Sequence, residues 1–332
     1  MSDAPPALPA AGARHMLRVL TPDRRRTLVT FGAAVLVFVV GAFLHKGFAS
    51  PGSVKAILVV ASFVGIVAAG QTFVIFVGGI DLSVPWVLNA AGILFATASL
   101  GRDTRAAYAV LVALALGAAV GAVNGVCIAY LAVPAVVMTL AMNGIMEGLT
   151  LGRTKGLTCG TCASYAPPVL QKAIHEDAAG IPVDLILWFG VIVLITFVLS
   201  FTTFGRRIYA TGTNPLAAYL AGVNVRILTM VLYMMSGLFA ALGGIVLVAY
   251  SGQPTLGMGD PFLFQSIAAA VIGGVSILGG RGHYLGTVAG AVGLIGLISL
   301  LQAENMPEYG RSIVYGVAIL VVLLLFGREE RV

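Results

Sequence analysis

Long apolar runs, separated by short polar segments, fill most of the chain. A helix that crosses a bilayer needs about 20 predominantly apolar residues, and most of the runs approach this length. The pattern therefore predicts an all-α, polytopic membrane protein with about ten transmembrane helices. The predicted spans lie at about 27–44, 55–77, 84–100, 106–131, 134–151, 183–203, 226–250, 262–279, 284–302 and 309–327.

The composition supports the same class. Of the 332 residues, 59% are hydrophobic and 10% are charged, and the mean hydropathy is +1.02. Soluble domains are roughly 45–50% apolar and about 25% charged, so these values exclude an ordinary cytosolic enzyme and a disordered chain. The net charge of +6 does not indicate nucleic-acid binding, because the basic residues lie in short loops beside the apolar runs.

An even number of spans places both termini on one side of the membrane, and the positive-inside rule identifies that side as the cytoplasm. The first run is too long for a signal-peptide core and is expected to remain as a helix. Arg206 and Arg207 mark a cytoplasmic loop. The expected organisation is a basic cytoplasmic segment at 1–26, a transmembrane domain at 27–327 with an external loop at about 152–182 and a cytoplasmic loop at about 204–225, and a cytoplasmic tail at 328–332.

The loop at 204–225 contains the signals of a short helix. Asn214 is a favourable N-cap, Pro215 suits the first helical position, and Gly222 can end the helix. The intervening residues, 216–221, make about two turns, which is too short to span a membrane. Two interpretations are open: a docking element for a cytoplasmic partner, or a simple connector.

Charged residues are scarce within the predicted spans, and Asp81 stands out among them. It follows two glycines in the segment Gly78-Gly79-Ile80-Asp81-Leu82-Ser83. The glycines break the incoming helix, and Asp81 or Ser83 can cap the outgoing one. The segment is either a capped turn or a broken helix that lines a pathway, since a broken backbone in a membrane must face protein or water. A second Gly-Gly step, Gly273-Gly274, occurs in the C-terminal half and is weak evidence for an internal repeat.

The other polar residues within the spans are mostly neutral amides. Each alone is best explained as a helix–helix hydrogen bond, but together they suit an uncharged polar cargo rather than an ion. The sequence has no constellation of a Ser-His-Asp or H-E-x-x-H enzyme, no His pair at metal-ligand spacing, and no P-loop. Neither enzymatic activity nor a metal site is therefore expected. The neutral amides within the spans are Gln71, Asn89, Asn124, Asn143 and Gln265.

Cys159 and Cys162 form a C-x-x-C in the predicted external loop. A local disulfide is the leading interpretation, because the external compartment is oxidising. A zinc site would need further ligands, and His175 is the one nearby in sequence. Cys127 lies in a span, where an inert packing role is expected.

Glycines at spacing four occur in two spans. Gly117, Gly121 and Gly125 form one series, and Gly286 and Gly290 form another. Such spacing lets helix backbones approach closely in lipid. Close packing within one subunit is the favoured interpretation over a dimer interface.

Three stretches, in order along the chain, resemble hallmarks of bacterial ABC-transporter permeases of the ribose/xylose/galactose/autoinducer type. They are V-G-G-I-D-L-S-V at 77–84, G-R-R-I-Y-A-T-G-T-N-P-L-A-A-Y-L-A-G-V-N-V at 205–225 and I-A-A-A-V-I-G-G-V-S-I-L-G-G-R-G at 267–282. The resemblance implies an ABC importer permease fold in the bacterial inner membrane. It also implies a permease subunit that forms the pathway of an ATP-driven importer for a sugar or sugar-like polar solute. The alternative is an ATP-independent facilitator or channel for a small neutral polar solute.

The resemblance implies partners as well. These are a cytoplasmic ATP-binding subunit, an external solute-binding protein, and a second copy of the chain or a paralogous permease, with no nucleic acid. ATP and Mg would bind the ATPase, so no cofactor is expected on this chain. ATP-driven closure of the ATPases would move the 214–222 helix and switch the spans between outward and inward states.

The resemblance also assigns roles to residues. The family's coupling segment falls on Asn214, Ala217, Ala218 and Gly222, with Pro215 where an acidic or polar residue is more usual. A bulky charge at Ala218 is therefore expected to uncouple ATP hydrolysis from uptake. The helix breaks of the pathway fall on Gly78, Gly79, Asp81, Ser83, Gly273, Gly274 and Ser276.

Overall fold

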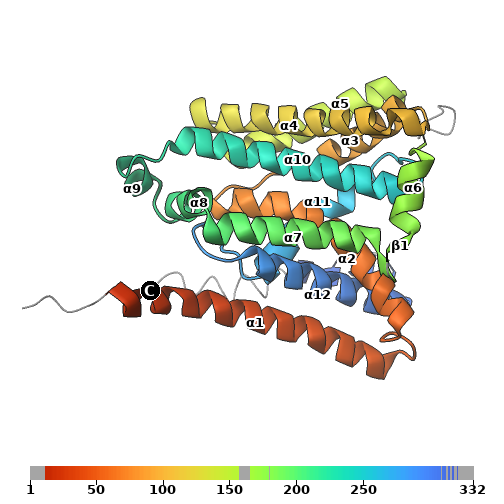
Figure 1. Cartoon of the computed structure of the whole chain (residues 1–332), viewed down its shortest axis with the longest axis horizontal. Helices are drawn as coiled ribbons and strands as arrows, with labels where there is room; N and C mark the ends of the chain where they lie inside the picture. Colours follow the sequence, from red (N-terminus) through yellow and green to blue (C-terminus); the bar gives the residue numbers. More distant parts are fainter. Residues whose placement is uncertain are drawn as a thin grey trace, which may run out of the picture.

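The computed structural model describes residues 12–156, 165–178, 180–307, 309–311, 313–314, 316–317 and 320, with side chains from Thr27 onward. Helices dominate this part of the chain (Figure 1). In chain order they are α1 (Gly12–Leu44), α2 (Pro51–Phe76), α3 (Val84–Ser99), the 3-10 helix η1 (Asp103–Arg105), α4 (Ala106–Tyr130), α5 (Ala135–Thr154), α6 (Pro168–His175), α7 (Val183–Phe201), α8 (Thr203–Thr213), α9 (Pro215–Leu220), α10 (Val225–Ser251), α11 (Asp260–Ile272) and α12 (Tyr284–Ala303).

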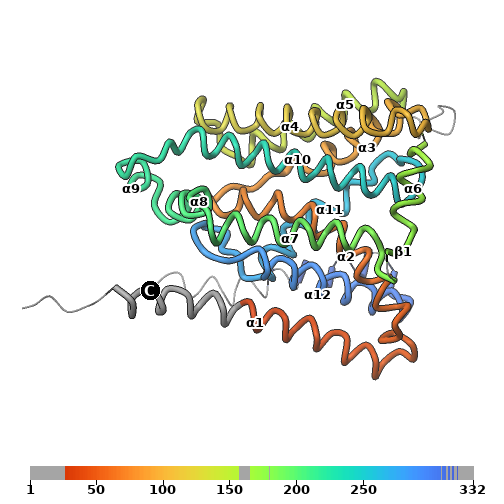
Figure 2. The backbone as a smooth tube through the Cα atoms, in the orientation of Figure 1, coloured from red at the N-terminus to blue at the C-terminus, as the bar shows by residue number. Residues whose placement is uncertain are grey.

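The two ends of the helix bundle carry different short elements. At one end, the short helices α8 and α9 turn the chain back into α10, as the green-to-teal part of the tube shows (Figure 2). At the other end lie α6 and a small antiparallel hairpin, in which β1 (Asp177–Ala178) pairs with β2 (Ile181–Pro182). These are called the α9 end and the α6 end below.

The predicted all-α membrane class is confirmed, but ten full spans are not. Within the described part of the chain, seven helices are long and apolar enough to cross a membrane: α1 from Thr27, α2, η1 with α4, α5, α7, α10 and α12. The predicted span at 84–100 coincides with α3, which has 16 residues, and the one at 262–279 is reduced to α11, which has 13, because the Gly273-Gly274 break ends that helix. Both helices are shorter than the seven long ones. The last predicted span, 309–327, lies largely outside the described residues.

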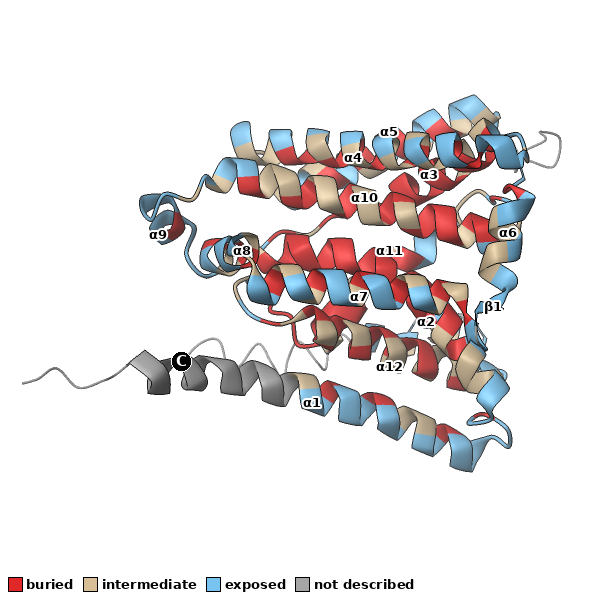
Figure 3. Ribbon diagram, viewed as in Figure 1, coloured by how far each residue is buried: buried red, intermediate tan, exposed pale blue. Residues whose placement is uncertain are grey.

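Burial separates a central helix from peripheral ones. Of the 18-residue apolar window in α2, 89% is buried, against 17% in α1 and 22% in α5 (Figure 3). A helix that is apolar on all sides belongs in the interior of a bundle or in lipid. The apolar side chains that α1, α4, α5 and α7 turn outward therefore suit the hydrocarbon of a bilayer.

The glycine series of α4 packs directly on α10, within one subunit. A Cβ atom at Gly117 or Gly121 would collide with the carbonyl oxygens of Gly237 and Tyr233, and one at Gly125 would meet the α10 backbone as well. This confirms the interpretation of these glycines as intrasubunit packing positions. The second series packs α12 on α11 in the same way, through Gly286 and Gly290.

We predict that Gly121→Leu destabilises the protein, because the added side chain must push α4 away from α10. Overpacking costs typically about 1–3 kcal/mol. Gly190→Leu is the matched control, since Gly190 lies on α7 with no atom within 4 Å of its Cβ position. Thermal unfolding in detergent should show a lower Tm for Gly121→Leu only. Equal Tm values for the two variants would contradict the packing described for α4 and α10.

Candidate functional site

Helix α2 ends inside the bundle with a glycine-dependent cap. Gly78 N donates to Ile75 O at 2.9 Å, and Gly79 N donates to Val74 O at 3.1 Å. These two bonds form a Schellman motif, which places the residue after the helix cap in the left-handed region. Gly78 has a φ of +77° and fills that position. The predicted helix break is therefore a defined structural element, held by its own backbone hydrogen bonds.

Helix α11 ends in the same way. Gly274 N donates to Val271 O at 2.9 Å, and Val275 N donates to Ala270 O at 3.0 Å, with Gly274 at a φ of +83°. The two Gly-Gly steps therefore share the same backbone geometry, a Schellman motif at the end of a helix. Within the turn that follows α11, Ser276 N donates to Arg281 O at 3.1 Å. Gly273 packs against the α12 backbone.

The two helix breaks meet each other. Gly280 N donates to Phe76 O at 2.9 Å, which pairs a carbonyl group at the end of α2 with the turn after α11. A Cβ atom on Gly279 would lie 2.9 Å from both Gly78 N and Phe76 O. The backbones are in contact here without intervening side chains. Carbonyl groups at a helix end have no partner within the helix, so this bond satisfies one of them inside the bundle.

Helix α8 packs into the same place. Gly212 leaves no room for a Cβ atom, because Phe76 O and Gly280 N lie against its Cα. Tyr209 adds two contacts: its ring centroid lies 5.1 Å from that of Phe76, and its hydroxyl donates to Gly282 O at 2.9 Å. We call this contact of three segments the glycine junction; its members are Gly78, Gly212, Gly279 and Gly280.

Helix α9 follows α8 directly and has the local geometry predicted for it. Asn214 is the N-cap, and its side-chain oxygen accepts a hydrogen bond from Ala217 N at 3.0 Å. Pro215 occupies the first turn. Gly222, at a φ of +86°, ends the segment in a third Schellman motif. The six-residue helix is thus fixed at its N-terminus by a side-chain cap and at its C-terminus by backbone hydrogen bonds.

Ala218, one of the residues to which a coupling role was assigned, lies on the inner face of α9. Ala218 is buried, with 4% of its surface exposed, and points toward its own chain. The residues that α9 presents outward are Leu216, Tyr219 and Leu220, which are 67%, 65% and 77% exposed. A charge at Ala218 would therefore disturb the packing of α9 against the rest of its own chain. The sequence could not distinguish the two faces of a helix with fewer than two full turns.

Asp81 orders the chain between α2 and α3, but it does not cap α3. Its side chain is 1% exposed, and Oδ1 accepts hydrogen bonds from Ser83 N at 3.0 Å and Ser83 Oγ at 2.6 Å. The N-cap of α3 is Ser83, and its side chain makes no capping bond. The carboxylate therefore stabilises the turn that leads into the helix. Tyr233 and Ser236 of α10 lie beside it.

Two of the five predicted amide residues support this turn. With its amide in the orientation that satisfies both groups, Gln71 accepts from Asp81 N and donates to Asp81 O, each at 3.3 Å. Asn124 of α4 donates from Nδ2 to Ser83 Oγ at 2.9 Å. The others lie elsewhere: Asn89 is fully buried on α3, while Asn143 on α5 and Gln265 on α11 are half-buried.

Gly78 was predicted as a helix break, but the other residues of the glycine junction occurred only within longer motifs. Tyr209 and Gly212 lie within 205–225, and Gly279 and Gly280 lie within 267–282. Nothing in their spacing indicates that they meet, because the contacts are between backbones far apart in the chain. Cys159 and Cys162 lie outside the described residues, so their pairing stays a prediction. Among the residues that the structure describes, no group of three His, Cys, Asp or Glu side chains is placed to hold a metal ion.

The three stretches that carry the family resemblance thus converge on one site. A family model described as the permease component of the branched-chain amino acid transport system matches residues 53–323. The chain belongs to this family of transport permeases. The match covers most of the chain, from α2 through α12, so the permease classification applies to this part of the bundle.

Relatives of this permease are found in bacterial import systems. The ribose import permease protein RbsC of Escherichia coli strain K12 is 35% identical over 322 residues, covering 96% of this chain and 98% of the relative. The autoinducer 2 import system permease protein LsrC of Escherichia coli O9:H4 is 32% identical over 332 residues, covering 94% and 90%. RbsC of Haemophilus influenzae is 31% identical over 297 residues, covering 89% and 91%. No solved structure matches the chain.

We predict different outcomes for two substitutions of Asp81. Asp81→Asn keeps an oxygen that accepts from Ser83 N and Oγ, so the permease should fold with little change in Tm. Asp81→Leu removes that acceptor and leaves two buried donors unpaired. A buried unpaired group costs about 1–3 kcal/mol, so the Tm should fall and uptake should be lost.

Uptake into ATP-loaded vesicles, with and without a protonophore, distinguishes this ordering role from proton transfer. An ordering role predicts that Asp81→Asn retains much of the uptake and that the protonophore has no effect at constant ATP. Equal and complete loss of uptake in both variants, together with protonophore sensitivity, would show that Asp81 carries protons.

Proposed function

We propose that this chain is the transmembrane permease subunit of an ATP-driven importer, and that it forms the pathway for a sugar or sugar-like polar solute. The observation that carries the proposal is the glycine junction, which joins a short helix at one end of the bundle to two helix breaks inside it. The bacterial relatives, named for ribose and autoinducer 2 import, support the same function.

Helix α9 is the docking element for a cytoplasmic ATP-binding subunit. Leu216, Tyr219 and Leu220 present exposed apolar surface at the α9 end, beyond the long spans. Arg206 and Arg207 on the neighbouring helix α8 are exposed, and this positive charge supports a cytoplasmic position for the α9 end. ATP and Mg bind the partner subunit. A second copy of the chain, or a paralogous permease, completes the membrane part of the bacterial inner-membrane complex.

The contacts of α8 define how a displacement of α9 reaches the pathway. Gly212 and Tyr209 of α8 touch both helix breaks, and side-chain rearrangement cannot absorb a shift where backbones are in direct contact. When the ATPase subunits close and displace α9, both breaks therefore move with it. The short helices α3 and α11 adjoin those breaks, so they tilt and switch the pathway between its outward and inward states.

The chemistry of the interior suits a neutral polar cargo. Gln71 and Asn124 are neutral amides, and the Asp81 carboxylate is engaged by Ser83 within its own turn. Ion-coupled carriers instead use intramembrane charges as relays. Hydroxyl-rich solutes exchange hydrogen bonds readily with amides and hydroxyls, so the permease holds the cargo weakly. An external binding protein delivers this cargo.

Substitution on the outer face of α9 tests the docking role. We predict that Leu220→Glu leaves the amount of folded permease in the membrane unchanged, because Leu220 is 77% exposed. The charge should abolish co-purification of the ATP-binding subunit and reduce ATP-dependent uptake about tenfold or more, since a buried unpaired charge at an interface costs several kcal/mol.

Thr203→Glu is the matched control for this experiment. Thr203 is exposed at the first turn of α8, on the same end of the bundle but outside α9. It should retain both the bound ATPase and the uptake. Normal uptake by Leu220→Glu would refute α9 as the docking element. Uptake that continues in vesicles without ATP would instead support a facilitator.

A further inference from the structure

The segment at 165–178 and 180–182, here called the outer strap, crosses the α6 end of the bundle. It consists of α6 and the β1–β2 hairpin, and α6 contacts η1, α10 and α7 in turn (Figure 1). Its two halves are held in different ways. That asymmetry indicates which half is able to move.

The first half of the outer strap is anchored by three hydrogen bonds to its backbone. Ala166 is fully buried, and its N donates to Gly252 O at the end of α10 at 3.0 Å. Ser99 Oγ of α3 donates to Tyr165 O at 3.0 Å. Asp103 Oδ1 of η1 accepts from Val169 N at 2.8 Å. This half is therefore fixed to three separate elements.

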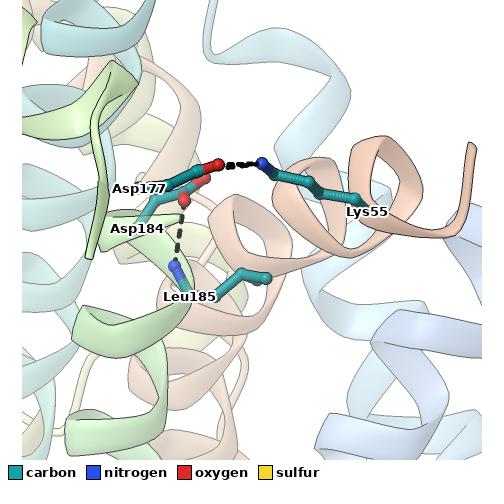
Figure 4. Close-up of polar contacts among 4 residues, drawn as sticks. All are labelled: Lys55, Asp177, Asp184 and Leu185. Atoms are coloured by element: carbon teal, nitrogen blue, oxygen red, sulfur yellow. Dashed lines mark hydrogen bonds and ion pairs between the residues drawn. The ribbon is translucent and has the colours of Figure 1, made fainter. Parts of the chain in front are cut away.

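The second half is held by surface contacts above a cavity. Lys55 Nζ of α2 lies 2.6 and 2.8 Å from the two carboxylate oxygens of Asp177, and the two side chains are 42% and 41% exposed (Figure 4). The His175 ring stacks on Tyr250 with centroids 5.2 Å apart. These four side chains line an open cavity of about 220 Å³. Exposed ion pairs contribute little to stability, so breaking the Lys55–Asp177 pair costs little, and Ile174 and Pro182 supply the apolar contacts of this half.

A second acceptor for Lys55 lies in the same cavity. Asp184, at the start of α7, is 1% exposed; its Oδ1 accepts from Leu185 N at 3.0 Å, and its Oδ2 has no hydrogen-bond partner within the described part of the chain. Lys55 and Asp184 both line the cavity and interact electrostatically. A buried carboxylate oxygen without a partner is unfavourable, and a nearby ammonium group can satisfy it.

We propose that Lys55 is a two-position latch: it holds the outer strap down through Asp177 in the structure described here, and it transfers to Asp184 when the strap lifts at the external end during transport. Asp184 thereby gains its missing partner as Asp177 loses its own. One charge pair replaces another, so the two positions are close in free energy and the binding of cargo or partner decides between them. This inference rests on the proposed transport function.

A reversible cross-link tests whether the outer strap must lift. Lys55→Cys and Asp177→Cys are introduced into a chain whose Cys127, Cys159 and Cys162 are replaced by serine. The two thiols are joined by a short, reducible bis-methanethiosulfonate linker, because a lysine side chain keeps the two backbones too far apart for a disulfide. The complex with its ATPase and binding protein is reconstituted in vesicles, and uptake of labelled ribose, xylose and galactose is measured.

The latch predicts that the linker abolishes uptake, that reductant restores it to the level of the same double-cysteine chain before linking, and that ATP binding to the partner persists. The control pair, Asp103→Cys and Val169→Cys, cross-links the anchored half and should reduce uptake less than twofold. Full uptake with the Lys55–Asp177 cross-link in place would overturn the latch. A parent complex that accumulates none of the three sugars when ATP is supplied would instead count against the proposed function.

Single substitutions test the two acceptors separately. Asp184→Asn keeps the oxygen that accepts from Leu185 N but removes the charge that receives Lys55, so uptake should fall about two- to fivefold without a change in Tm. Asp177→Asn releases the outer strap and should not slow uptake. Equal uptake by Asp184→Asn and the parent would show that Lys55 has no second position.

Discussion

A helix that ends inside a membrane leaves carbonyl groups that water cannot satisfy, and the rest of this structure depends on how those groups are paired. Schellman motifs close the ends of α2 and α11, and the bond from Gly280 N to Phe76 O ties the two ends together. The pairing requires backbones to touch, which only glycine permits here. Because α8 enters the same contact through Gly212, the helix that precedes α9 is fixed to both breaks.

The sequence predicted features that depend on local chemistry. The caps of α9 at Asn214 and Gly222 follow from residue type and spacing, and so does the break at Gly78. The sequence did not predict which features meet, because the glycine junction joins residues about 70 and 200 positions apart through backbone atoms that carry no side-chain signal. The buried position of Ala218 was missed for a related reason: its burial depends on packing against other elements.

The number of spans shows a further limit of hydropathy. The runs at 84–100 and 262–279 are apolar enough to be counted as spans, yet α3 and α11 are short and adjoin the breaks. Hydropathy reports that a segment is buried in lipid or protein and does not report where a helix stops. The residues that stop it are glycines, whose small weight on a hydropathy scale hides their effect on the backbone.

In this mechanism, α9 and the two helix breaks move as one body. Spin labels at Ala221 at the end of α9 and at Leu278 after α11 measure this directly, since both positions are exposed and neither is among the three side chains assigned to docking; a second pair at Leu278 and Leu140 on α5 reports motion against the bundle. Distances are compared between the nucleotide-free complex and the complex trapped with ATP. Movement as one body predicts an unchanged Ala221–Leu278 distance and a changed Leu278–Leu140 distance. An Ala221–Leu278 distance that changes on ATP binding would contradict it.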